Sequence, residues 1–211
     1  IGVDTMGKPL KTILEYAEEN QYKTGLVATS TIIHATPASF IAKDTFRYNY
    51  ESIAYDCLNV DIDLFIGGGR KYFTNREDGL NLIDSLIKRN YSVINGIENL
   101  NTDIEGKFAV FTAEGSNPKI LEGMGEMLPS STEKAIKLLN KSKNGFFLMV
   151  EGSQIDWGGE DNDIDFVITE TIDFSNAIQK ALEFAIEDGE TLLIVTADHE
   201  SGGLTLVDGN L

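Results

Sequence analysis

A strand-to-helix junction lies in residues 25–40, which read GLVATSTIIHATPASF. The first part is apolar enough for a buried strand, and Pro37 suits the first turn of a helix, where no backbone N–H is needed. The polar residues His34 and Thr36 fall between the two elements, and Thr36 is the expected N-cap. Ligands of open α/β sheets bind at the carboxyl ends of strands, so this junction predicts a functional edge.

The same alternation continues along the chain. Short apolar runs bounded by Gly, Asn or Asp alternate with segments of helical periodicity, which predicts an α/β fold with a largely parallel central sheet sandwiched by helices. Strands are expected at residues 25–30, 62–66, 91–95, 108–111, 145–150 and 191–196. Helices are expected at residues 9–19, 37–43, 81–89, 131–139 and 174–186. Residues 112–129 contain Gly and Pro with little periodicity, which favours a long surface connection.

The composition is that of an ordinary globular protein. The chain has 211 residues, of which 42% are hydrophobic and 24% charged, so one α/β core domain over residues 1–211 is expected. A net charge of −17 without a basic cluster disfavours nucleic-acid binding, and no apolar run is long enough for a membrane span. The single Cys57 excludes an internal disulfide and a multi-cysteine metal site. The start at Ile1 and the end at Leu211 suggest a piece of a longer protein.

A second strand end carries possible metal ligands. Residues 193–203 run from an expected buried strand into Asp198 and His199, an oxygen and a nitrogen ligand of the kind that zinc binds. A plainer alternative is an aspartate that caps a helix, followed by a surface histidine. The two residues alone leave both interpretations open.

A third strand end is acidic. Glu151 follows five apolar residues, and an unpaired charge at the end of a core strand is costly unless a metal ion or an arginine relieves it. Asp156 and Glu160 follow at i and i+4, a spacing that places both carboxylates on one helix face. The remaining acids, Asp161, Asp163 and Asp165, are expected in a solvated loop.

Two basic segments are candidates for anion binding. Arg47 could bind an anion with two hydrogen bonds, although a solvent-exposed arginine in a stretch with Tyr48 and Tyr50 is the plainer interpretation. Residues 67–73 read GGGRKYF and follow a strand, but neither nucleotide-binding glycine pattern occurs there. This segment is expected to be a structural turn.

Taken together, these segments resemble the alkaline phosphatase family. The matching pieces occur in family order and cover nearly the whole chain, at residues 2–10, 29–40, 63–73, 150–157 and 195–203. The resemblance implies hydrolysis of a small phosphomonoester through a covalent phosphoserine, with Zn²⁺ and Mg²⁺ as cofactors. It also implies a periplasmic or secreted location and a homodimer.

The resemblance assigns metal ligands residue by residue. It implies that Asp198 and His199 bind one zinc and that Asp156 binds a second. It implies that Glu151 and Thr36 hold a magnesium. These residues come from three strand ends, so the implied site requires those ends to meet.

Other implied roles concern the substrate and the departures from the family. Arg47 matches the arginine that clamps the phosphate, and His34 is implied to lie near the magnesium and the phosphate. Trp157 is implied to lie beside the zinc-ligand segment. Glu160 stands where the family has histidine, and the added oxygen ligand either favours Mg²⁺ or Mn²⁺ over Zn²⁺ or leaves that site empty.

The resemblance places further functional residues outside this sequence. The nucleophilic serine and a metal-bridging aspartate are implied upstream of Ile1, and a zinc-binding histidine is implied beyond Leu211. The chain alone is therefore expected to be inactive or nearly so. Two alternatives stay open: a related phosphodiesterase or sulfatase, because fold analogy does not fix the substrate, and a non-catalytic metal- or anion-binding module.

Overall fold

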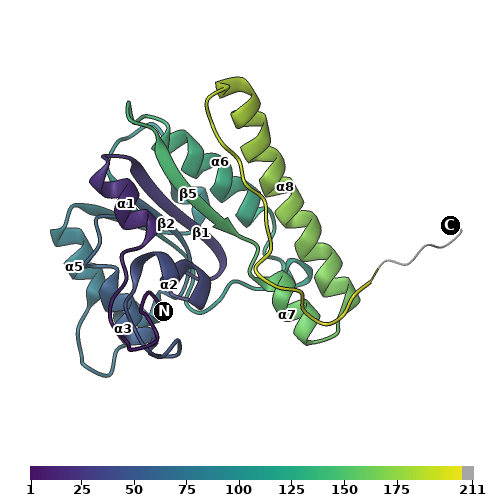
Figure 1. The fold of residues 1–211 in the computed structure, drawn as a ribbon, viewed down its shortest axis with the longest axis horizontal. Helices are drawn as coiled ribbons and strands as arrows, with labels where there is room; N and C mark the ends of the chain where they lie inside the picture. The colour runs from purple at the N-terminus through teal and green to yellow at the C-terminus, as the bar shows by residue number, and fades with distance from the viewer. Residues whose placement is uncertain (206–211) are drawn as a thin grey trace, which may run out of the picture.

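A five-stranded parallel sheet forms the centre of the computed structural model, which describes residues 1–205 (Figure 1). The strand order is β3-β4-β2-β1-β5, and every neighbouring pair is parallel. This confirms the predicted α/β class. The strands are β1 (Lys23–Thr31), β2 (Leu64–Gly68), β3 (Tyr91–Asn95), β4 (Lys107–Ala113) and β5 (Phe146–Glu151).

Each face of the sheet has its own apolar core. Successive strand residues point to opposite faces, so Leu26 and Phe65 belong to one core while Val27 and Ile66 belong to the other. The first core is covered by five short helices, which lie together on one side in Figure 1. They are α1 (Ile13–Glu19), α2 (Ala35–Ile41), α3 (Tyr50–Asp56), α4 (Lys71–Thr74) and α5 (Leu82–Lys88).

Two long helices lie on the other side of the sheet. Helix α6 (Met127–Leu139) packs on β1, β2 and β5, and α8 (Ile164–Asp188) packs on α6 and on α7 (Gln154–Glu160) (Figure 1). Short 3₁₀ turns, η1 (Ile97–Asn99) and η2 (Ile120–Glu122), complete the elements. Within residues 1–205, none of the helices has the length and apolar character that crossing a membrane requires.

Several helices begin elsewhere than expected because of local capping. Helix α1 begins at Ile13, since Thr12 forms a capping box with Glu15, while Pro9 pairs with Val3 in an isolated bridge. The N-cap of α2 is His34, so the prediction of Thr36 as its cap is wrong. Helix α6 begins at Met127, inside the expected surface connection.

The long helix α8 begins ten residues earlier than the predicted helix, at Ile164 rather than Phe174. Asp163 accepts a hydrogen bond from the Phe166 backbone N–H at 3.1 Å and so caps the helix. Asp165 lies in the first turn, where the helix dipole favours an acid. The expected solvated loop at these two aspartates is therefore wrong.

The predicted strand at residues 191–196 does not form. These residues are irregular, and Leu192 and Ile194 are 82% and 72% exposed. Apolar composition favours a strand, but a strand also needs a hydrogen-bonded neighbour, and β5 pairs with β1 alone among the described residues. Residues 206–211 lie outside the part of the chain that the structure describes. They include Leu211, the end that suggests a piece of a longer protein.

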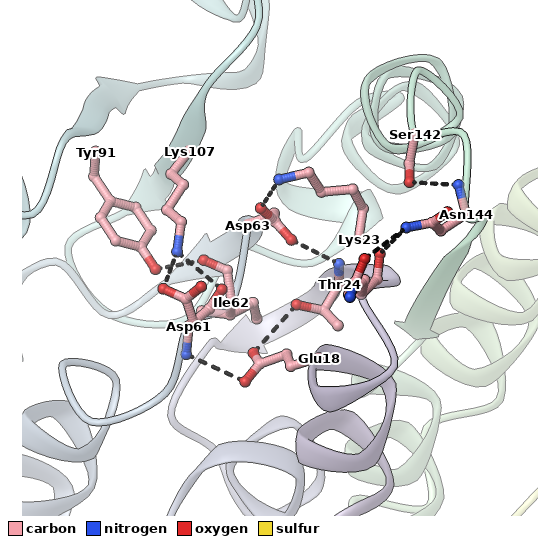
Figure 2. Close-up of polar contacts among 11 residues, drawn as sticks. Glu18, Lys23, Thr24, Asp61, Ile62, Asp63, Tyr91, Lys107, Ser142 and Asn144 are labelled. Carbon is pink, nitrogen blue, oxygen red and sulfur yellow. Dashed lines mark hydrogen bonds and ion pairs between the residues drawn. The ribbon is translucent and has the colours of Figure 1, made fainter.

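The amino ends of the strands are joined by polar contacts (Figure 2). Lys23 pairs with Asp63 at 2.5 Å, and the other carboxylate oxygen of Asp63 accepts the Thr24 backbone N–H at 3.0 Å. Asp61 pairs with Lys107, and its backbone N–H is bound by Glu18. The polar groups at the amino ends of the strands are therefore paired with the protein's own side chains. The carboxyl ends of the strands, here called the carboxyl edge, are left for a site.

Candidate metal and phosphate site

The carboxyl ends of β1 and β5 meet at the predicted site. Glu151 is the last residue of β5 and lies opposite Ala28 of β1. The Ser153 hydroxyl donates to Glu151 Oε2 at 2.6 Å and accepts the Ser30 backbone N–H at 3.2 Å. A single hydroxyl thus ties the Glu151 carboxylate to the end of the neighbouring strand.

Glu151 sits in an environment that opposes its negative charge. Burial raises the pKa of this carboxyl above its ordinary value, and the charges of Asp198 and Asp156 raise it further. Hydrogen bonding by Ser153 and Thr36 lowers the pKa but does not offset the rise. A cation among these carboxylates would lower the pKa of Glu151 again, because opposite charge favours the ionised form.

Helix α7 is fixed to the sheet by a buried amide. Gln154 Nε2 donates to the carbonyls of Thr29, at 3.2 Å, and Asn117, at 3.0 Å. This contact places Asp156, two residues further on, beside the carboxyl edge. Asp156 Oδ1 is buried without a hydrogen-bond partner among residues 1–205, and His199 Nδ1 lies 4.0 Å from it.

Asp198 and His199 lie on the irregular segment that follows α8. His199 Nε2 is 3.6 Å from Asp198 Oδ2, and both side chains are exposed. The Glu200 carbonyl, 2.9 Å from His199 Nδ1, raises the pKa of His199, and the charge of Asp198 adds to the effect. The segment lies close against α7: the Ser201 hydroxyl donates to the Asp156 carbonyl at 3.5 Å, and a Cβ on Gly159 would lie 2.8 Å from the Ser201 carbonyl oxygen.

His34 faces the same edge from the start of α2. Its ring meets the Trp157 ring edge-on, with the ring centres 5.7 Å apart. The position of Trp157 beside the zinc-ligand segment stays a prediction. Burial lowers the pKa of His34, the charge of Arg47 lowers it further, and Asp156 opposes both. The imidazole is therefore neutral at physiological pH, and its buried Nδ1 has no partner in the described part of the chain.

The two remaining predicted residues are exposed. Arg47 lies in the turn before α3, with its guanidinium carbon 5.6 Å from the centre of the Tyr48 ring. Glu160 ends α7, one turn after Asp156 on the same helix, and its charge contributes to the raised pKa of His199. Neither residue is in direct contact with Glu151 or Asp156 in this arrangement.

The predicted ligands gather as pairs rather than as one coordination sphere. Thr36 lies by Glu151, and His199 lies between Asp156 and Asp198, but within residues 1–205 no three such side chains converge as a metal ion requires. The donor set nevertheless fits a divalent cation. A buried carboxyl with a raised pKa and a buried, unpartnered carboxylate oxygen are both relieved by positive charge.

Sequence reasoning missed two residues that build this site. Ser153 orients Glu151, and Gln154 anchors α7 to β1. Both follow directly after a strand end, which is a positional signal for functional residues. Their polar character in an otherwise apolar neighbourhood could have marked them, but only the fold shows which groups they reach.

A comparison with protein families decides the relationship. The model of the family described as alkaline phosphatase matches residues 1–210. The chain belongs to the alkaline phosphatase family. This confirms the resemblance predicted from the five sequence segments.

Individual alkaline phosphatases agree along nearly the whole chain. Alkaline phosphatase 3 of Bacillus subtilis is 42% identical over 98% of this chain and 46% of its own length. The alkaline phosphatase of Escherichia coli is 32% identical over 94% of this chain and 53% of its own length. The chain thus spans about half the length of these relatives.

Solved structures show the same fold. The alkaline phosphatase of the Antarctic bacterium TAB5 superimposes with a TM-score of 0.94 at 43% identity, covering 98% of this chain and 61% of that one. A mutant of the TAB5 enzyme with Mg bound in the M3 site gives a TM-score of 0.92 at 42% identity, covering 96% and 59%. The parallel sheet with helices on both faces is therefore the family's fold.

Proposed function

We propose that this chain forms the metal- and phosphate-binding core of a metal-dependent phosphomonoesterase of the alkaline phosphatase type. The observation that carries the proposal is the half-buried Glu151 carboxyl at the end of β5, whose pKa is raised by burial and by the like charges of Asp198 and Asp156. Such an arrangement is stable only when a cation or protons compensate it. Membership of the family makes the cation the better explanation. Residues 1–211 are proposed to act as one α/β core domain of a longer protein.

Each predicted ligand has a proposed role. Glu151 and Thr36 would hold Mg²⁺, in keeping with the Mg bound by the TAB5 mutant. Asp198 and His199 would hold one Zn²⁺, with a nitrogen ligand beside an oxygen, and Asp156 would hold a second. Bound divalent ions would supply positive charge that stabilises the phosphoryl oxygens during displacement.

The chain's own residues bind and orient. Arg47 would bind two phosphate oxygens with its planar guanidinium. Ser153 keeps the Glu151 carboxylate turned toward the end of β1, because its hydroxyl is itself held by the Ser30 N–H. His34 stays neutral and adds no charge that would compete with a metal. The nucleophilic serine is proposed to lie upstream of Ile1, from the family resemblance.

Substrate class is tested by rates on three esters. The protein that carries this chain is assayed with a phosphomonoester, a phosphodiester and a sulfate ester, with added Mg²⁺ and Zn²⁺ and again after chelation. We expect the monoester to react fastest and chelation to abolish the reaction. A faster diester or sulfate ester would instead identify the related hydrolases, and metal binding without hydrolysis would identify a binding module.

Arg47 is tested separately from the metals. Arg47→Ala should raise KM for the phosphomonoester and weaken inhibition by inorganic phosphate about tenfold or more, with metal content unchanged. Arg89→Ala, another exposed arginine at the end of α5, is the control and should change neither. Loss of metal in Arg47→Ala would show that its proposed role is wrong.

The glutamate at the family's histidine position tests the identity of the metal. Glu160→His should increase the affinity for Zn²⁺ relative to Mg²⁺, since imidazole is the better zinc ligand. Competition titration with a zinc indicator measures this, and Glu187→His on the exposed end of α8 is the control. An unchanged zinc affinity would place Glu160 outside the site.

Location and assembly are also proposals. A periplasmic or secreted location and a homodimer follow from the resemblance alone. Cell fractionation and sedimentation of the protein that carries this chain test them. A chain of net charge −17 is expected to repel a nucleic-acid backbone. The proposed ligand is therefore a small phosphomonoester and not a nucleic acid.

A further inference from the structure

Four aromatic side chains next to Arg47 form a row, here called the aromatic ladder: Phe46, Tyr48, Tyr50 and Tyr72. Successive ring centres are 5.3, 6.2 and 5.0 Å apart. Tyr50 and Tyr72 pack on the apolar core, whereas Phe46 and Tyr48 are 54% and 57% exposed. One end of the ladder is therefore anchored, and the other end presents aromatic surface to solvent.

The turn that carries the exposed rings is held in place. Asp44 Oδ1 accepts hydrogen bonds from the Phe46 backbone N–H at 2.8 Å and from Asn49 Nδ2 at 2.9 Å. Burial alone would raise the pKa of Asp44, but these bonds and a contact from Ser52 outweigh it and lower the pKa. The carboxylate is thus charged and bonded at neutral pH, and the rings rest on an ordered turn.

Arg47 links the ladder to the carboxyl edge of the sheet. Its guanidinium carbon lies 5.6 Å from the Tyr48 ring centre, and its charge adds to the burial that lowers the pKa of His34. The guanidinium therefore lies beside the exposed end of the ladder, and its charge reaches His34 at the start of α2. A phosphate bound by Arg47 would extend its single ester arm from a point beside these rings.

We propose that the aromatic ladder is a subsite for a planar aromatic group on the alcohol side of the phosphomonoester, such as a nucleobase or an aryl ring. The proposal rests on the proposed phosphomonoesterase function and names its preferred substrate class. Aromatic side chains stack on any base because every base has a π-face, and a preformed platform loses little freedom on binding. Arginine beside the rings supplies the charge complementary to the phosphate of the same molecule.

Two substrates that differ only in the base give the sharpest test. Adenosine 5′-monophosphate and ribose 5-phosphate share the same ester linkage, so their kcat/KM ratio reports the base alone. We expect a ratio of about ten in the protein that carries this chain, falling toward one in Tyr48→Leu and Phe46→Leu. Tyr55→Leu, an exposed tyrosine on α3, is the matched control and should keep the full ratio.

The outcomes separate this inference from the function on which it rests. A ratio near one in the unsubstituted protein, or a ratio that neither substitution lowers, overturns the subsite. An equal loss on both substrates also overturns it and points to a surface covered by another segment or copy. If neither ester is hydrolysed, the proposed function fails, and calorimetric binding of adenosine 5′-monophosphate against ribose 5-phosphate still decides the subsite.

Discussion

The two ends of the parallel sheet differ in how their polar groups are treated. At the amino ends, Lys23, Asp63, Asp61 and Lys107 are paired with one another (Figure 2). At the carboxyl ends, buried polar atoms have no partner among residues 1–205; they belong to Thr29, Thr31, His34, Arg70, Thr112 and Asp156. One end is closed by the protein, and the other is left incomplete.

This difference suggests that the amino ends of the strands serve the stability of the fold and that the carboxyl ends serve binding. A buried polar atom without a partner costs about 1 to 3 kcal/mol, and native proteins keep few of them. Their concentration at one edge indicates that a ligand completes the hydrogen bonding and the charge there. In the described part of the chain the amino edge holds no such groups, and it contributes to the free energy of unfolding instead.

The largest effect is expected at the carboxyl edge. Glu151→Gln keeps the shape of the side chain but removes its charge, so kcat/KM for a phosphomonoester should fall about a thousandfold, close to 4 kcal/mol. Stabilisation against heat by Mg²⁺ should disappear, while stability after chelation stays equal or rises because no charge is buried. Thermal denaturation with and without Mg²⁺ measures both. Glu187→Gln is the control, and equal loss of stability in chelator would contradict the comparison.

The amino edge should respond in the opposite way. Asp63→Ala leaves Lys23 and the Thr24 N–H without their acceptor, so the free energy of unfolding should fall by about 2 to 3 kcal/mol. Urea denaturation measures this loss, and metal affinity should not change. Asp63→Asn retains an acceptor oxygen and should cost less than the alanine variant. A loss of metal affinity in either variant would contradict the conclusion that the amino edge serves stability alone.

Asp173 tests whether every unpartnered group marks a binding site. It lies in α8, 6% exposed, and burial raises its pKa to about 7, with the charges of Glu170 and Glu126 adding to the rise. Its folded-state pKa exceeds the unfolded value, so its contribution to stability is complete below about pH 4 and is lost as pH rises through 7.

The corresponding experiment compares two pH values. Asp173→Asn should remove about 2 kcal/mol of the decrease in unfolding free energy between pH 5 and pH 8. Urea denaturation of both proteins at each pH isolates this contribution from other titrating groups. Unaltered metal binding is expected, since Asp173 is not among the proposed metal ligands. An identical pH dependence in the two proteins would show that Asp173 is ionised throughout.

The smallest effect is expected where α7 meets the C-terminal segment. Gly159→Ala places a methyl group 2.8 Å from the Ser201 carbonyl oxygen, which forces the backbone of the C-terminal segment to move and to carry His199 with it. The unfolding free energy should fall by about 1 kcal/mol or less. Amide hydrogen exchange of residues 197–203 should become faster. Gly115→Ala, at an open position without a positive φ, controls for the loss of glycine and should leave this exchange unchanged.

The sequence was sufficient to predict the five strands of the sheet, but it also predicted a sixth strand that does not form. Runs such as 62–66 and 145–150 are apolar on both faces and bounded by turn residues, and each formed a strand within about two residues of the expected limits. Residues 191–196 have the same composition without a strand beside them. The apolar pattern of a segment indicates its tendency to be buried, whereas its pairing with a neighbouring strand depends on the rest of the fold.

The site was predictable to the level of strand ends. Glu151 and Thr36 lie together as the junctions implied, because parallel strands bring their carboxyl ends to one edge. Ser153 could not be assigned a role, since its partner Ser30 is distant in sequence. The exposed position of Glu160 was also invisible, because helical spacing gives a shared face but not the direction in which that face points.

The outer side of β5 has a practical consequence for handling this chain. β5 ends the strand order, so its second edge carries unpaired backbone groups among the described residues, next to the half-buried apolar side chains of residues 146–150. Open edges of this kind template intermolecular sheet formation. Preparations of the chain at high protein concentration should therefore be prone to aggregation, and a lysine introduced on this edge is the natural way to keep them dispersed.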